Sequence, residues 1–345
     1  MENHVVFPGL GLELDISRVA FSIGDFNVYW YGVIIAVGFC LALVFAFANA
    51  KRFGIDSDRM VDVIIGTTIC AVICARAYYV VFAPFEYQSL WDMVNLRDGG
   101  LAIYGGVLGA VLFGILFCKW RKVPVLPMLD LALAGFLLGQ GIGRWGNFFN
   151  QEAFGSNTTL PWGMYSQSTH DYLASVQDTL AAQGIVVDPT MPVHPTFLYE
   201  SIWCLLGFAL LALYIPHRRF NGEMSLLYAV WYGAERAVVE GLRTDSLMWG
   251  PVRVSQLLAA VSAVAALVVW AVLRRKYKGI PLQVPALPGQ SEGEQPEKTP
   301  QPQTAPQFFA QPEVSPEAEP ENLQPEQPGQ AEHAEQPESQ TPADQ

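Results

Sequence analysis

Seven long apolar segments constrain the fold of this chain more than any other feature of its sequence. Each is roughly as long as the run of about 20 apolar residues that a helix needs to cross a bilayer. They lie near residues 27–50, 58–83, 101–119, 126–145, 196–215, 223–242 and 255–273. The fourth and the sixth are the least apolar, because they carry charged side chains. The pattern predicts an all-α integral membrane protein, a bundle of about seven transmembrane helices.

The composition agrees with a membrane protein. Of the 345 residues, 51% are hydrophobic and only 15% are charged, which is typical of that class. All five cysteines lie in apolar segments, and none has the CxxC or Cys/His spacing of a metal site. Cys70 and Cys74, four residues apart on one predicted helix, leave a redox or metal pair as an alternative to two small buried residues. We expect neither a metal nor another cofactor.

The basic residues indicate how the helices are oriented. They occupy alternate loops, at Lys51, Arg52, Lys119, Arg121, Lys122, His217, Arg218, Arg219, Arg274, Arg275 and Lys276. The loop 146–195 contains no Lys or Arg. The positive-inside rule then puts the N-terminus outside and the C-terminus in the cytoplasm. No basic stretch precedes the first apolar run and no small-residue cleavage site follows it, so we expect a retained span rather than a signal peptide.

Three regions follow from these patterns: an outer N-terminal segment (1–26), a membrane domain (27–278, with its outer loop at about 146–195) and a tail (279–345) rich in Pro, Gln and Glu. From residue 281 onward there are 12 acidic residues and one Lys, so −11 of the chain's net charge of −12 belongs to the tail. Such a composition buries too little apolar surface to fold, which predicts a disordered cytoplasmic tail. Nothing in the charge pattern supports nucleic-acid binding.

The outer loop contains one helical pattern. Within residues 170–183, Tyr172, Leu173, Val176 and Leu180 recur at helical spacing, and Gly184 follows. The spacing predicts a short amphipathic helix that rests on the membrane. The alternative is a lid or a docking arm for a partner.

A polar cluster follows the fourth apolar run. Arg144, Asn147, Asn150 and Glu152 crowd one hydrophobic boundary. An Arg near a bilayer centre costs about 2.5–3.5 kcal/mol on insertion scales, so we expect an anionic partner. Arg grips a phosphate with paired donors, which predicts an anion site at the outer membrane surface. The alternative is a structural Arg that snorkels to the headgroups. The GxGxxG match at 141–146 ends a membrane helix and lacks the strand that a dinucleotide fingerprint requires.

A second polar group lies in the sixth apolar segment. Tyr232, Arg236, Glu240 and Arg243 are spaced by four, four and three residues and share one helical stripe. We expect this stripe to face the bundle interior, with Arg236 as a second phosphate-facing arginine held by a carboxylate. Alternatively, Arg236 and Glu240 simply neutralise each other. Glu235 lies off the stripe and helps at most to orient it.

Further candidates lie at matching depth in other segments. Tyr104 precedes Gly105 and Gly109, which allow close helix packing, and is otherwise an interfacial aromatic residue. His194 and Glu200 flank the start of the fifth helix. Two single residues, Arg76 in the second span and Tyr31 in the first, add weaker evidence.

Together these stretches resemble the bacterial prolipoprotein diacylglyceryl transferases. Residues 143–155 fill that family's signature, G-R-x-G-N-F-x-N-x-E-x-x-G. The other matching motifs are Y-W-Y-G at 29–32, A-R-x-x-Y at 75–79, Y-G-G-x-x-G at 104–109, H-P-T-x-x-Y-E at 194–200 and Y-G-x-x-R-x-x-x-E-x-x-R at 232–243. The resemblance covers residues from about 20 to 275 and leaves out the tail.

The resemblance implies an enzyme of the bacterial plasma membrane that performs the first step of lipoprotein maturation. Such an enzyme transfers the diacylglyceryl group of phosphatidylglycerol to the lipobox cysteine thiol of a prolipoprotein signal peptide, forms a thioether and releases glycerol phosphate. Arg144 and Arg236 would stabilise the phosphate, Asn147 would donate a hydrogen bond, and Glu152 and Glu240 would orient the guanidinium groups. The remaining expected substrate-binding residues are Asn150, Gly155, Tyr31, Arg76, His194, Glu200, Tyr232 and Arg243.

The general base is where the sequence departs from the family pattern. Many members have His where this chain has Tyr104, and a phenol with a pKa near 10 is a poor base. We expect Tyr104 to orient substrate first and to act as a base second. His194 and the substrate phosphate are the alternatives.

Two other classes of function remain compatible with intramembrane charges. A transporter or flippase for an anionic lipid or solute would need polar stripes that run through the bilayer, whereas these charges gather toward the outer side. A lipid-binding scaffold would need the anion site but no reactive partner.

Overall fold

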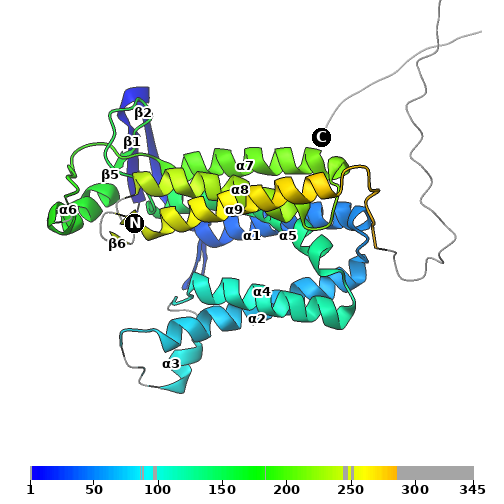
Figure 1. Cartoon of the computed structure of the whole chain (residues 1–345). Helices are drawn as coiled ribbons and strands as arrows, with labels where there is room; N and C mark the ends of the chain where they lie inside the picture. The colour runs from blue at the N-terminus through cyan, green and yellow to red at the C-terminus, as the bar shows by residue number, and fades with distance from the viewer. Residues whose placement is uncertain are drawn as a thin grey trace, which may run out of the picture. The chain divides into compact units, whose positions relative to one another are not determined.

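The computed structural model describes residues 2–85, 87, 89–95, 99–182, 184–243, 248–249 and 252–285. The predicted disorder of the tail beyond residue 285 lies outside the described residues. Within them the chain is mostly helical (Figure 1).

Each predicted apolar segment forms a helix. The seven helices that correspond to these segments are α1 (Trp30–Asn49), α2 (Ser57–Val81), α4 (Ile103–Arg121), α5 (Val125–Asn150), α7 (Thr196–Tyr214), α8 (Glu223–Val239) and α9 (Val254–Lys276). Six of them are long and apolar enough to cross a membrane. The exception is α8, which has 17 residues and carries the charged stripe. The multi-span prediction is therefore confirmed for six helices.

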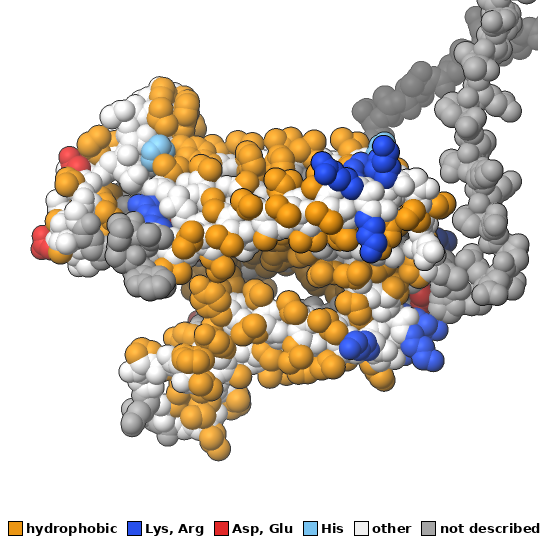
Figure 2. All heavy atoms as spheres, in the orientation of Figure 1, with side chains coloured by type: hydrophobic (Ala, Val, Ile, Leu, Met, Phe, Trp, Pro, Cys, Tyr) orange, Lys and Arg blue, Asp and Glu red, His pale blue; other side chains and the backbone are white. Residues whose placement is uncertain are grey.

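Shorter helices lie between the long ones. They are α3 (Leu90–Val94), α6 (Gln167–Ala182) and the 3-10 turns η2 (Ala50–Phe53), η3 (Ile215–His217) and η4 (Glu240–Leu242), while the 3-10 turn η1 (Pro8–Leu10) lies between the first two strands. In Figure 2 hydrophobic side chains cover the visible long faces of the helices. Lys and Arg side chains gather at the end of these helices opposite β1, β2 and α6.

The long helices pack in pairs. α1 packs on α5, α5 on α7, and α8 on α9, while α2 packs chiefly on α4. The α2–α4 contact is close because both predicted packing glycines lie in it. A Cβ on Gly105 would lie 2.5 Å from the carbonyl oxygen of Cys74, and one on Gly109 would lie 2.6 Å from the Cys74 Cβ. The predicted packing role of these glycines is confirmed.

The N-terminal segment forms strands that the sequence analysis did not anticipate. β1 (Glu2–Phe7) pairs with β2 (Leu12–Ser17) and with β5 (Tyr165–Ser166), in the antiparallel order β2–β1–β5. β3 (Val19–Ile23) and β4 (Phe26–Tyr29) form a hairpin that leads into α1. A last hairpin joins β6 (Met248–Trp249) to β7 (Val252–Arg253). Residues 2–26, the expected outer N-terminal segment, thus belong largely to two small sheets.

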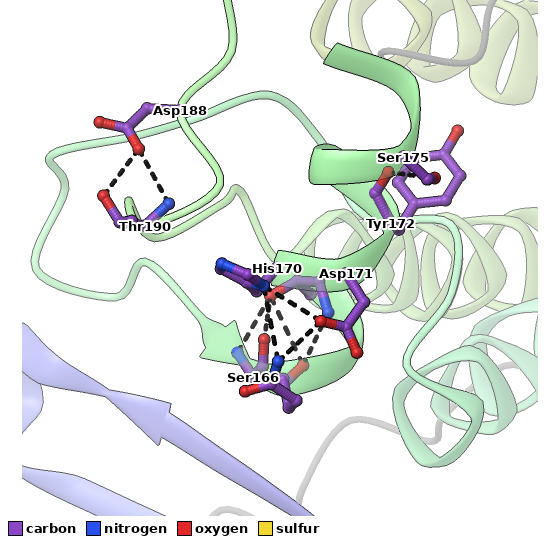
Figure 3. A network of polar contacts seen from close by, with 9 residues as sticks. Ser166, His170, Asp171, Tyr172, Ser175, Asp188 and Thr190 are labelled. Atoms are coloured by element: carbon purple, nitrogen blue, oxygen red, sulfur yellow. Dashed lines mark hydrogen bonds and ion pairs between the residues drawn. The ribbon is translucent and has the colours of Figure 1, made fainter.

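The predicted outer helix is confirmed as α6, but its apolar face is covered by protein. Leu173 and Leu180 are buried in a cluster with β1, β2 and the segment that precedes α7. The start of α6 is capped reciprocally: the Ser166 amide donates to Thr169 Oγ1 at 3.0 Å and the Thr169 amide donates to Ser166 Oγ at 3.2 Å. Figure 3 shows Ser166 at this end of the helix. The protein therefore covers Leu173 and Leu180 of the predicted stripe, whereas Tyr172 remains exposed.

The start of α8 is capped by a side chain from another helix. Gly222, the N-cap residue, has φ +98° and offers no side-chain acceptor. Asp130 of α5, fully buried, accepts hydrogen bonds from the amide of Gly222 at 2.7 Å and from the amide of Ser225 at 2.8 Å. These bonds satisfy amides that a helix start leaves unpaired. Asp130 therefore fixes the first turn of α8 against α5.

We expect Asp130→Ala to destabilise the protein by about 1–3 kcal/mol, because it leaves buried amides of α8 unpaired. The measurement is thermal unfolding in detergent. Asp58→Ala, which removes an exposed aspartate from the first turn of α2, is the control and should shift the unfolding midpoint little. Equal shifts in both variants would contradict the capping role.

Candidate active site

A buried cluster of ion pairs joins three long helices. Glu200, at the start of α7, is 1% exposed and lies between two arginines. It forms an ion pair with Arg144 of α5 and lies 3.8 Å from Arg236 Nη1 of α8. Arg236 also donates from Nη2 to Glu240 Oε2 at 2.5 Å. The structure thus brings together the predicted residues Arg144, Arg236, Glu200 and Glu240.

Glycines within the signature and just before it allow α5 to approach α1 and α7 closely. A Cβ on Gly146 would lie 2.6 Å from the Tyr31 ring of α1, and one on Gly141 would lie 3.2 Å from the carbonyl oxygen of Ser201 on α7. The indole of Trp145 donates to Ser201 Oγ at 3.1 Å. This packing places Arg144 within reach of Glu200, because α5 is held directly against α7.

A third carboxylate, which the sequence analysis set aside, also faces the cluster. Glu235 of α8 is 4% exposed, and its charge interacts with Glu200, Arg144 and Arg236. Neither of its carboxylate oxygens has a hydrogen-bond partner among the described residues. The sequence feature that could have identified Glu235 is its spacing of three residues from Tyr232, which puts both side chains on neighbouring positions of one helix face.

The rest of the signature forms a separate polar group at the end of α5. The side-chain amides of Asn147 and Asn150 donate to Glu152 Oε1 at 3.0 and 3.1 Å. Gln151 and Ala153 have φ values of +53° and +56°, so the chain turns sharply here. Glu152 was expected to orient a guanidinium; among the described contacts it accepts hydrogen bonds from these two amides instead.

An open cavity of about 750 Å³ lies beside this group. The β3–β4 hairpin, the start of α1, the end of α5 and the start of α6 line it, and Tyr31, Asn150, Glu152 and Tyr172 face it. Arg18, also in the lining, donates to the carbonyl oxygen of Asn150 at 2.8 Å. The cavity therefore combines aromatic surface with amide and carboxylate groups.

The last glycine of the signature connects two other motifs. The Gly155 amide donates to the carbonyl oxygen of His194 at 2.9 Å, and Gly155 bridges to Arg243 as an isolated antiparallel pair. A Cβ on Gly155 would lie 2.8 Å from the His194 Cβ. Only glycine fits this crossing without a shift of the backbone. Since α8 ends at Val239, Arg243 lies beyond the helix and leaves the predicted stripe.

Two expected site residues lie in the α2–α4 pair, outside the ion-pair cluster. Arg76 donates to the carbonyl oxygens of Met93, Asp92, Gly99 and Gly100 at 2.7–2.9 Å. These bonds hold the connection between α2 and α4. Tyr104, in the first turn of α4, is 70% exposed. The contacts among the described residues do not join either side chain to Arg144 or Arg236.

His194 and Tyr232 lie near the cluster in different surroundings. His194 Nδ1 is 3.2 Å from the Tyr199 hydroxyl, and burial lowers the pKa of His194 below its usual value. Tyr232 stacks on Tyr228 at 5.6 Å between ring centroids. In the described part of the chain, no group of three or more His, Cys, Asp and Glu side chains is placed to hold a metal ion.

Comparison with known proteins identifies the family. Residues 18–272 match the model of the family described as prolipoprotein diacylglyceryl transferase. This chain belongs to that family. It is 41% identical over 271 residues to the phosphatidylglycerol–prolipoprotein diacylglyceryl transferase of Bacillus cytotoxicus, covering 77% of this chain and 95% of that protein. The identically named protein of Limosilactobacillus reuteri is 42% identical over 275 residues, covering 79% and 95%. The family resemblance that the motifs predicted is confirmed.

The lowered pKa of His194 predicts a pH effect on stability. Its folded-state pKa lies below the ordinary value of 6.5. In the pH window between these two values the unfolded chain binds a proton more readily than the folded chain. The contribution of His194 to stability is therefore complete above about pH 6.5 and declines as the pH falls through this window. We expect the unfolding midpoint to fall more on acidification, from about pH 7.5 to about pH 5.5, in the wild type than in His194→Gln. An equal decline in both proteins would contradict this contribution of His194.

Proposed function

We propose that this protein transfers the diacylglyceryl group of phosphatidylglycerol to the lipobox cysteine thiol of a prolipoprotein signal peptide, forming a thioether and releasing glycerol phosphate. The observation that carries the proposal is the pair of partly buried arginines, Arg144 and Arg236, which share the buried Glu200 beside the family signature. Family membership favours this reaction over a transporter or flippase.

The chemistry explains why two arginines are needed. The sulfur attacks the glycerol carbon that bears the phosphate ester, the carbon–sulfur bond forms, and the carbon–oxygen bond breaks. The electron pair of that bond passes to the departing phosphate, and the thiol proton leaves to a base. Guanidinium groups already held in place stabilise the growing negative charge without reorganisation. Glu200 and Glu240 would hold Arg144 and Arg236 in that position.

The acceptor peptide would reach the site through the cavity beside Glu152. The cavity adjoins the signature, and Tyr31, Asn150 and Glu152 line it. Tyrosine and amide groups suit an extended peptide, because they offer apolar contact and hydrogen bonds to its backbone. Asn147 would act through Glu152, to which it donates. Gly155, His194, Tyr232 and Arg243 would shape the adjoining wall, and Arg76 would support the site by holding the α2–α4 connection.

The membrane arrangement follows the same proposal. Residues 27–278 would form the membrane domain of a bacterial plasma-membrane protein, with α8 as a short seventh span inside the bundle and residues 1–26 outside. The Lys and Arg side chains gathered opposite the sheet in Figure 2 support a cytoplasmic location for that end. The tail 279–345 would then be cytoplasmic.

The test is incubation of the purified protein with phosphatidylglycerol and a lipobox peptide, followed by mass spectrometry of the peptide. We expect a diacylglyceryl mass gain on the cysteine that is absent from a Cys→Ser peptide. Arg144→Ala should reduce the rate by about 10²–10³-fold, as loss of one preorganised donor costs about 2.7–4 kcal/mol. An unmodified peptide under conditions where the lipid binds would overturn the proposal.

For Tyr104, whose hydroxyl we propose orients substrate, we expect Tyr104→Phe to raise KM by about tenfold or less and to leave kcat largely unchanged, because one neutral hydrogen bond contributes about 0.5–1.5 kcal/mol. If Tyr104 were the base, kcat would instead fall by about 10²–10⁴-fold. Steady-state kinetics with the lipobox peptide separates these cases. Wild-type kinetics in the variant would exclude both roles.

A further inference from the structure

Glu235 is the acid of the arginine cluster whose oxygens make neither a hydrogen bond nor an ion pair in the contacts among the described residues. Glu200 pairs with both arginines and Glu240 pairs with Arg236. The two oxygens of Glu235 are buried and have no hydrogen-bond partner among the described residues. A buried carboxylate without a hydrogen-bond donor has a high free energy when ionised and a much lower one when protonated.

The helices packed around Glu235 supply few charges to compensate it. The charged groups that act on it are Arg144 of α5, Glu200 of α7 and Arg236 of its own helix. The neutral titratable groups nearby are Cys204 of α7 and Tyr228 and Tyr232 of α8. On α9, residues 254–270 contain no titratable side chain.

Protonation of Glu235 changes the charge beside the ion-paired side chains by one unit, and Arg253 donates to the backbone carbonyl of Glu240 next to them. The two arginines of the cluster contribute two positive charges, and Glu200 and Glu240 contribute two negative charges. An ionised Glu235 adds one negative charge to this group, which opposes the approach of a phosphodiester anion. A protonated Glu235 adds none, so the anion binds without that repulsion.

We propose that binding of the phosphodiester anion at Arg144 and Arg236 is coupled to uptake of one proton by Glu235. This inference rests on the proposed function, because it takes the lipid phosphate as the anion that the arginines bind. Glu235 then acts as a positioning residue: it touches no substrate atom and works through the charge that it adds to or removes from the arginine pair.

The coupling has a definite sign. The protonated form of Glu235 binds the anion more tightly, so the affinity declines as rising pH removes the proton. Between the protonation midpoints of the free and the bound protein, the affinity falls by up to about tenfold per pH unit. Outside that window the affinity is constant.

The experiment measures the affinity of detergent-solubilised protein for dioctanoyl phosphatidylglycerol by calorimetry from about pH 6 to about pH 9. For the wild type we expect the Kd to rise by about tenfold across this range. In Glu235→Gln, whose amide has the shape of the protonated acid, we expect tight binding at every pH and no such rise. A weakly buffered titration provides the second readout: lipid addition should take up protons in the wild type and none in the variant.

Glu240→Gln is the matched control. It removes an acid from the same helix region, but Glu240 is paired with Arg236, so the absolute affinity changes and the pH dependence remains. Thermal unfolding of each variant confirms that it is folded. The uncharged lipid dioctanoylglycerol should show no pH dependence with any of the proteins.

The possible results separate the two proposals. A Kd that does not vary with pH in the wild type, or a Glu235→Gln variant that keeps the wild-type pH dependence, overturns the coupling while the proposed function stands. Lipid binding that is absent at every pH, or binding that Arg144→Ala and Arg236→Ala leave unchanged, overturns the proposed function and the coupling together.

Discussion

The contact of Glu200 with two arginines is the interaction on which the site depends. Its carboxylate is almost fully buried and joins Arg144 of α5 to Arg236 of α8 from its own place on α7. Removal of one partner from a buried ion pair is strongly destabilising, because the remaining charge is left uncompensated. The same contact therefore fixes the relative positions of three helices and presents both guanidinium groups in one place. Close packing of α5 on α7 at Gly141 accompanies this contact.

Electrostatic balance gives this arrangement a second property. Before an anion binds, two neighbouring arginines with no acid beside them would repel each other. Glu200 and Glu240 remove that repulsion, but they also remove the excess positive charge that would attract a phosphate. The site must therefore bind its anion through geometry and paired donors rather than through net charge. Under these conditions one additional buried acid, Glu235, has a large influence.

Much of the fold and part of the site could be predicted from the sequence. The apolar runs located every long helix because length and hydropathy are local properties, and the four-residue spacing of Arg236 and Glu240 identified their pair. The pairing of β1 with β5 could not be predicted, since about 160 residues separate the two strands and β5 has only two residues. Glu235 was missed because the stripe was drawn through Tyr232 and Arg236, whereas the packing of α5 and α7 decides which neighbouring positions are also buried. Arg76 of α2 and Tyr104 of α4 belong to motifs of the same family, but these two helices pack chiefly on each other. The described contacts therefore do not join either side chain to Arg144 or Arg236.

The cap that Asp130 provides has a consequence for the position of the arginine. α8 is attached to α5 at its first turn through Asp130 and is attached to α7 near its last turn through Arg236 and Glu200. Between these two attachments the helix has a fixed number of residues, and each residue advances the helix by 1.5 Å and turns it by about 100°. The count of residues between Ser225 and Arg236 is therefore as important as their identity. A single inserted residue would leave every side chain of the cluster in the sequence and still turn Arg236 away from Glu200.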